Sequence, residues 1–149
     1  MAVQTVYKDN ITKGTPGLIA TQRPVEADTK VVEGTADISF GVVVEQGTGN
    51  DGIVKVSSGG SYVGITLRKV TTLAEDGDVY KPKTQVPVLI KGDVWMTTGT
   101  AVTANAAATY HNTTGAVGAT AAGSSHKAIP NGTWLTAASS GGLAILRLK

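Results

Sequence analysis

The sequence contains no cysteine, which excludes disulfides and thiol chemistry. Charged residues make up 16% and aromatic residues 5% of the chain, and the charged share is below the ~25% of an average soluble domain. No run of Lys or Arg marks a nucleic-acid-binding surface. The longest apolar stretch, near residues 38–44, is far shorter than the ~20 residues of a membrane helix. Because the first residues also lack a signal-peptide pattern, we expect synthesis in the cytoplasm and no contact with a membrane or nucleic acid.

The residues that are abundant favour β-structure. Val and Thr are β-branched and fit a pleated sheet better than a helix. The 19 glycines are spread along the 149 residues and interrupt the chain too often for long helices. A chain of this length suits one domain with its own core. A surface that is poor in charge and rich in Thr, Ser and Gly also suits contact with other proteins, because little charge is desolvated on association.

Short apolar runs separated by turn residues predict an all-β fold, either a sandwich or a barrel. We expect one domain over residues 17–149 and an extended N-terminal arm over residues 1–16, for which a frayed terminus is the alternative. Pro87 cannot donate to a ladder and predicts an edge position or the beginning of its strand. Residues 104–108 are the only segment with helical character. The expected strands are 17–21, 31–32, 40–45, 53–56, 62–67, 86–91, 94–97, 133–135 and 143–148, with turns at 51–52, 92–93 and 131–132.

The segment GTGNDG at residues 47–52 fits the G-x-G-x-x-G pattern of dinucleotide-binding loops, in which a strand precedes the glycines and a helix follows them. A strand does precede it here, but Ile53 to Val56 is again strand-like and no crossover helix follows. We therefore interpret the glycines as a hairpin turn.

No other group of residues predicts a catalytic or metal site. His111 and His126 are the only histidines, and we interpret both as exposed loop residues. Glu75, Asp76 and Asp78 lack the spacing of a calcium loop and read as a solvated turn. Ser61 lacks the flanking pattern of a nucleophilic serine. The sequence therefore predicts no enzyme activity, no metal and no cofactor.

Several segments together are similar to a known family, the capsid cement (decoration) proteins of tailed bacteriophages. The resemblance implies an antiparallel β-sandwich, of which a jelly roll is one form, that binds the outer surface of the capsid, bridges major capsid subunits and stabilises the expanded shell. It also implies a homodimer or homotrimer, made in the bacterial host and located on the virion. The segments that carry it are VYKDNITKGTPGLIA (6–20), FGVVVEQGTG (40–49), YVGITLRK (62–69), VPVLIKGDVWM (86–96) and IPNGTWLTAASSGGLAILRLK (129–149).

Two further hypotheses concern contacts with partners. In the first, the N-terminal arm lies across a neighbouring subunit and orders on binding; its contact residues are Tyr7, Lys8, Ile11 and Lys13. In the second, the chain is a host-recognition or carbohydrate-binding β module of a phage tail fibre. Tyr62, Trp95 and Trp134 would then line a shallow groove.

Overall fold

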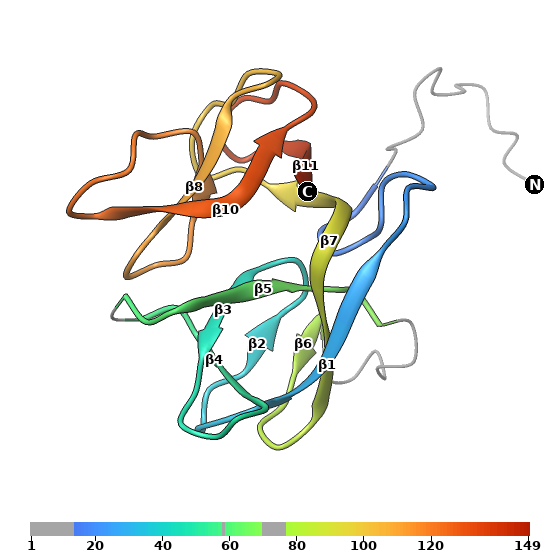
Figure 1. Ribbon diagram of the computed structural model, residues 1–149, viewed down its shortest axis with the longest axis vertical. Coiled ribbons are helices and arrows are strands. Elements are labelled where there is room, and N and C mark those ends of the chain that lie inside the picture. The colour runs from blue at the N-terminus through green and yellow to red at the C-terminus, as the bar shows by residue number, and fades with distance from the viewer. Residues whose placement is uncertain (1–13, 58, 70–76) are drawn as a thin grey trace, which may run out of the picture.

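The computed structural model describes residues 14–57, 59–69 and 77–149, and within them every regular element is a strand (Figure 1). The all-β prediction is thereby confirmed. The strands are β1 (Glu26–Val32), β2 (Ile38–Ser39), β3 (Val43–Gln46), β4 (Gly52–Lys55), β5 (Tyr62–Thr66), β6 (Val79–Tyr80), β7 (Gln85–Thr97), β8 (Ala107–His111), β9 (Val117–Gly118), β10 (His126–Trp134) and β11 (Leu143–Leu148).

Five strands close into a barrel. Their order is β1-β4-β3-β5-β7, and β7 pairs back with β1 to complete the ring. All of these pairs are antiparallel except β1–β4, which is parallel. The expected hairpin around residues 47–52 is confirmed, because β3 and β4 are its two arms. Strands β2 and β6 form a separate two-stranded ladder.

The long strand β7 carries the chain from the barrel into a second group of strands (Figure 1). Its first half pairs with β1 and β5, and its second half, Gly92–Thr97, pairs with β11. From β11 the order continues to β10, β8 and β9. We call β8–β11 the C-terminal sheet. Because both groups share β7, they form one nine-stranded sheet, and the sandwich and jelly-roll details of the expected fold stay predictions.

Two hydrophobic clusters explain why the apolar run Val42–Val44 is continuous rather than alternating. Val44 packs with residues of β1, β2, β4, β6 and the start of β7. Its neighbour Val43 points the other way, into a larger cluster shared with β5 and the C-terminal sheet. A strand that is buried on both faces reads as an unbroken apolar run. This larger cluster joins the barrel to the C-terminal sheet and contains Trp134, which is fully buried.

The turn expected at Gly92-Asp93 is wrong, because β7 runs through both residues without a break. Gly92 adopts φ 135°, a value that glycine reaches without a Cβ clash, and both residues pair with β11. The turn expected at Asn131-Gly132 is also wrong. These residues lie inside β10, where Asn131 has φ 55° and the register with β8 shifts, which is the signature of a bulge.

The expected edge position of Pro87 is wrong, because β7 has partners on both sides of it, while its place near the start of the strand is confirmed. The carbonyl of Pro87 accepts the N–H of Leu67, but proline has no N–H to return. The hydroxyl of Tyr80 donates to the Leu67 carbonyl instead. A side chain thus supplies the donor that the ladder lacks.

Two other segments differ from the expected elements. Residues 104–108 are not helical: Asn105 has φ 66° in a turn, and β8 begins at Ala107. Residues 17–21 do not form a strand of their own, and Ile19 makes only an isolated bridge to Val94. Alternation and turn residues alone do not distinguish such a segment from a strand, because a strand forms only where the segment pairs along a neighbouring strand.

Candidate functional site

The described chain begins with a segment that lies along β7, residues 14–23, which we call the strap. The N–H of Gly17 donates to the carbonyl of Trp95 over 2.9 Å, and the N–H of Trp95 donates to the carbonyl of Leu18, also over 2.9 Å. The strap is the segment through which residues 1–13 join the body. Its position on β7 therefore fixes where an N-terminal arm would leave the domain.

Glycine is required at the contacts of the strap. A Cβ on Gly14 would lie 2.4–2.5 Å from atoms of the Trp95 ring, so the indole rests directly on the glycine backbone. Gly17 and Gly41 pack against each other, with φ 83° and 65°. A Cβ on Gly41 would come within 2.4 Å of the Gly17 nitrogen. These approaches need residues without side chains.

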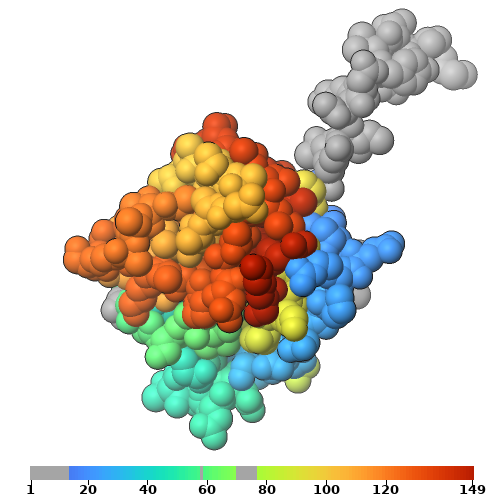
Figure 2. Space-filling view, turned by 45° about the horizontal axis from the view of Figure 1, so that its top comes forward, coloured from blue at the N-terminus to red at the C-terminus, as the bar shows by residue number. Residues whose placement is uncertain are grey.

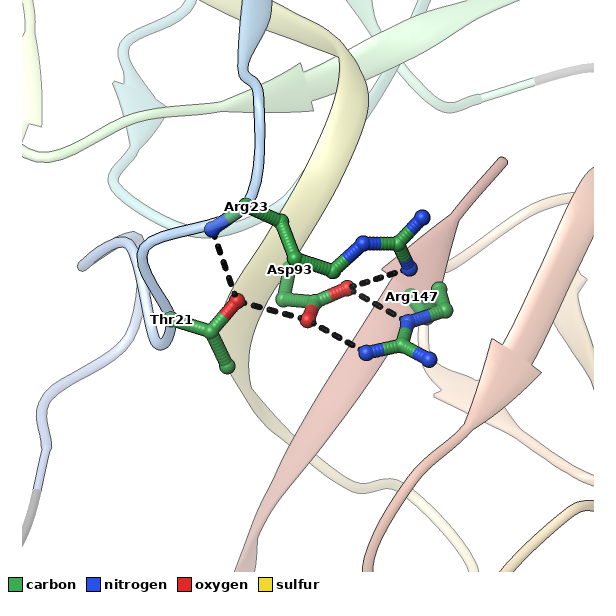
Figure 3. Close-up of polar contacts among 4 residues, drawn as sticks. All are labelled: Thr21, Arg23, Asp93 and Arg147. Carbon is green, nitrogen blue, oxygen red and sulfur yellow. Dashed lines mark hydrogen bonds and ion pairs between the residues drawn. The ribbon is translucent and has the colours of Figure 1, made fainter.

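A buried ionic cluster ties the strap to both β7 and β11 (Figure 3). The side chain of Asp93 is 0% exposed. Arg147 donates to it from Nε and Nη2 over 2.9 and 2.8 Å, and Thr21 donates from Oγ1 over 2.7 Å. The guanidinium of Arg23 lies 3.8 Å from the carboxylate.

The charges in this cluster stabilise the ionised carboxylate. Hydrogen bonding to Arg147 is the main cause that holds the pKa of Asp93 below its usual value; the hydrogen bond from Thr21 acts in the same direction and burial opposes it. Paired, two-point contacts of this kind are strong and fix geometry as well as energy. Asp93 and Arg147 are 54 positions apart, so no local motif predicts the pair. The only signal in the sequence is a charge inside each of two apolar strands.

Arg68 fastens the strap from the other side. Its backbone N–H donates to the carbonyl of Gly17, its Nε donates to the carbonyl of Pro16 over 3.4 Å, and its guanidinium lies 5.1 Å from the ring centre of Phe40. The same guanidinium binds both carboxylate oxygens of Asp78 over 3.0 and 2.8 Å, which lowers the pKa of Asp78. Asp78 is thus an ion-pair partner. Glu75 and Asp76 lie outside the described residues.

The glycine-rich loop at residues 47–52 holds an anion that belongs to the chain itself. The carboxylate of Glu33 accepts the N–H of Gly49 over 3.2–3.3 Å. A Cβ on Gly47 or Gly52 would lie 1.9 Å from Glu33 Oε2. The glycines therefore make room for this carboxylate.

The two histidines are not separate loop residues as expected. His111 on β8 and His126 on β10 are direct cross-strand partners, with ring centres 5.0 Å apart and planes at 83°. Both are half-buried. They border a small cavity. The pairing depends on the register of β8 and β10, so the separation of fifteen residues in the sequence does not predict it.

Tyr62, Trp95 and Trp134 do not form the groove that a carbohydrate-binding module would need. Trp134 is 0% exposed, and its indole N–H donates to the carbonyl of Gly118 over 2.9 Å. Tyr62 packs against the larger core cluster, and burial raises the pKa of its hydroxyl. Trp95 lies against Gly14. These side chains serve packing.

The predicted contact residues Tyr7, Lys8, Ile11 and Lys13 lie outside the described residues. Among the residues that are described, no cluster of three or more His, Cys, Asp or Glu side chains is arranged to hold a metal ion. In the same part of the chain no helix long and apolar enough to cross a membrane is present.

Fold and site together define a β-structured protein whose strap is held to the body by hydrogen bonds and ion pairs. The comparisons place it among phage structural proteins. A comparison with protein-family models matches residues 3–149 to the structural cement protein family (E217 gp24/Pam3 gp6). The chain belongs to this family, which confirms the resemblance drawn from its segments. Its role is therefore structural and associated with a bacteriophage capsid.

Two solved structures share the fold. One is a chain in the capsid of Myoviridae phage XM1, with TM-score 0.75 and 16% identity over 100% of this chain and 98% of that chain. The other is the head fiber gp8.5 N base of bacteriophage phi29, with TM-score 0.50 and 14% identity over 85% of this chain and 95% of that one. At these identities the likeness is one of fold. A search of curated protein sequences finds no match.

Proposed function

We propose that this protein binds the outer surface of a phage capsid as a homodimer or homotrimer, bridges neighbouring major capsid subunits and stabilises the expanded shell. The family match over residues 3–149 carries the proposal. Many modest contacts repeated over a closed shell reinforce one another, because each bound copy links several subunits at once.

The strap supports a role for the N-terminal arm in this binding. An arm transmits load to a body only if its base is fixed. Here the base is held by the Trp95–Gly14 contact, the Asp93 cluster and Arg68. We place the contact residues Tyr7, Lys8, Ile11 and Lys13 on the arm, where apolar and cationic side chains would lie on a neighbouring subunit.

Layered packing supports a rigid body. The larger core cluster joins β3 and β5 of the barrel to the C-terminal sheet, so the two layers face each other as in a sandwich. We infer that residues 17–149 act as one unit on the shell and that residues 1–16 form the arm, whose last residues, from Gly14 on, are its fixed base.

The test uses shells of the phage that carries this gene, prepared without the protein. Full-length protein should bind them and raise the temperature at which they release DNA or lose integrity. Deletion of residues 2–12 should weaken binding without lowering the thermal midpoint of the free domain. The quadruple alanine variant at residues 7, 8, 11 and 13 should behave like the deletion, and a double variant at Gln4 and Thr5 is the matched control. Unchanged binding of the deletion variant would remove the arm from the mechanism, and absence of wild-type binding would refute the proposed function.

A further inference from the structure

The acidic side chains are confined to one part of the chain. All 11 Asp and Glu residues occur at or before Asp93, and residues 94–149 contain none. The only ionisable side chains of residues 94–149 are His111, His126, Lys127, Arg147 and Lys149, apart from Tyr110. Because these residues form the end of β7 and the C-terminal sheet, the asymmetry is spatial as well as sequential. In Figure 2 the orange and red residues of this sheet form the upper part of the face, above the green and cyan residues of the barrel.

A donor-lined cavity lies within this acid-free region. Its volume is about 140 Å³, and we call it the histidine cup. His111 and His126 enter it from β8 and β10, and the remaining wall consists of small or hydroxylated residues: Gly99, Thr100, Ala116, Val117, Gly118 and Thr120. No carboxylate lines the cup.

Hydrogen bonds determine which ring nitrogen of each histidine is available. The Nδ1 atom of His111 accepts the N–H groups of Thr113 and Thr114 over 3.2 and 3.3 Å. A nitrogen that accepts carries no proton, so the proton of the neutral ring lies on Nε2. The Nδ1 atom of His126 lies 3.1 Å from the hydroxyl of Ser125, which can donate to it and place the proton on Nε2 there too.

This arrangement favours an acceptor ligand over a metal. An imidazole that binds a metal through Nε2 needs its proton on Nδ1, where it donates to an outer partner. The backbone N–H groups that face Nδ1 of His111 prevent that tautomer. Two Nε2–H groups instead suit a ligand with two acceptor atoms, such as a carboxylate.

We propose that the histidine cup is a docking site for a carboxylate side chain, Asp or Glu, presented by a capsid subunit. This inference rests on the proposed function and specifies the chemistry of its partner. Charge complementarity carries it: residues 94–149 hold cations and imidazoles but no acidic side chain, and a partner carboxylate in the cup meets no carboxylate in its lining. Lys127, the neighbour of His126, does not line the cup and donates to the carbonyls of Gly59 and Gly60.

Binding should therefore depend on the two Nε2–H donors. On shells prepared without the protein, we expect the double variant H111F/H126F, which removes both donors, to bind about tenfold more weakly than wild type. The double variant H111Q/H126Q keeps a neutral N–H donor in place of each ring and should bind like wild type. Lys149→Gln, a cation of the same sheet outside the cup, should also bind like wild type. Sodium acetate should compete for the cup and weaken wild-type binding more than sodium chloride at the same ionic strength.

The outcomes separate this inference from the proposed function. Wild type that fails to bind shells refutes the proposed function. If H111F/H126F binds as tightly as wild type, or if acetate competes no better than chloride, the histidine cup is refuted and capsid binding is left standing. On the free protein, nitrogen-15 spectra near pH 8 should show the proton on Nε2 of both rings; a proton on Nδ1 of His111 would overturn the assignment.

Discussion

The Tyr80 hydroxyl gives a sharp test of how β7 is held in the barrel. In an antiparallel ladder, Leu67 and residue 87 would exchange two hydrogen bonds. The N–H of Leu67 donates to the carbonyl of Pro87 over 2.9 Å, and the Tyr80 hydroxyl donates to the Leu67 carbonyl in place of the missing proline N–H. Tyr80→Phe removes this donor. It leaves the ring and its 4.7 Å contact with Phe40 in place.

The expected cost follows from burial. Tyr80 is 2% and Leu67 8% exposed, so the carbonyl gains little water when its donor is lost. A buried acceptor without a partner costs about 1–3 kcal/mol, and for a chain of this size 1 kcal/mol lowers the melting temperature by about 2–4 °C. We expect Tyr80→Phe to lose about 2 kcal/mol. Burial also raises the pKa of Tyr80 to about 12. In wild type the contribution of the neutral Tyr80 hydroxyl to the free energy of unfolding is complete below pH 10.0, the ordinary pKa of a tyrosine hydroxyl. It is lost as the pH rises from there through about 12.

Urea unfolding followed by circular dichroism and by tryptophan fluorescence measures the change. Tyr62→Phe is the matched control, because the Tyr62 hydroxyl is buried with no hydrogen-bond partner among the described residues and its removal should cost little. Pro87→Val restores a backbone N–H, so the Tyr80→Phe loss should shrink in that background. If Tyr80→Phe costs no more than Tyr62→Phe, or if its cost is the same with Val at 87, then the Tyr80 hydroxyl does not replace the missing hydrogen bond of the ladder and the reasoning is refuted.

Three further predictions concern the strap and the barrel. Asp93→Asn should cost about 2 kcal/mol by chemical unfolding, because Arg147 and Thr21 lose a charged hydrogen-bond acceptor. In wild type this contribution is present above pH 3.8, the ordinary pKa of an aspartate, and is lost as the pH falls through the lower pKa of the folded state. Gly14→Ala should displace the strap from Trp95 and weaken shell binding severalfold in a sedimentation assay, whereas Gly123→Ala, with nothing within 4 Å of its added Cβ, should bind normally. Gly64→Ala should cost at least about 2 kcal/mol by thermal unfolding, because its Cβ would lie 2.5 Å from the Leu89 carbonyl.

The sequence predicts the local elements of this fold better than their partners. Alternation and turn residues correctly indicate β5, the β3–β4 hairpin and the terminal strand β11. They fail at Gly92-Asp93 and Asn131-Gly132, where turn-forming dipeptides serve as a bend and a bulge within continuous strands. Turn propensity reports only that φ > 0 is accessible, and the neighbouring strand decides whether the chain reverses there.

The site is predicted less well because its contacts are long-range. The pairing of Asp93 with Arg147 and the edge-to-face contact of His111 with His126 depend on ladder register. Neither pair leaves a spacing motif in the chain. For Pro87, whose place near the start of its strand is confirmed, the edge alternative fails for a related reason: the compensating donor, Tyr80, comes from another strand.

The contacts of the strap determine how a force applied to residues 1–13 would be shared within the body. Strand β7 belongs to both the barrel and the C-terminal sheet, and the strap is attached along it by backbone hydrogen bonds. Asp93 joins that same strand to the strap through Thr21 and to the last strand through Arg147. A force applied to residues 1–13 would therefore act on β7 and β11 together rather than on one edge strand. Because bonds loaded together must break together, separation of the strap from the body costs more than the loss of any one contact.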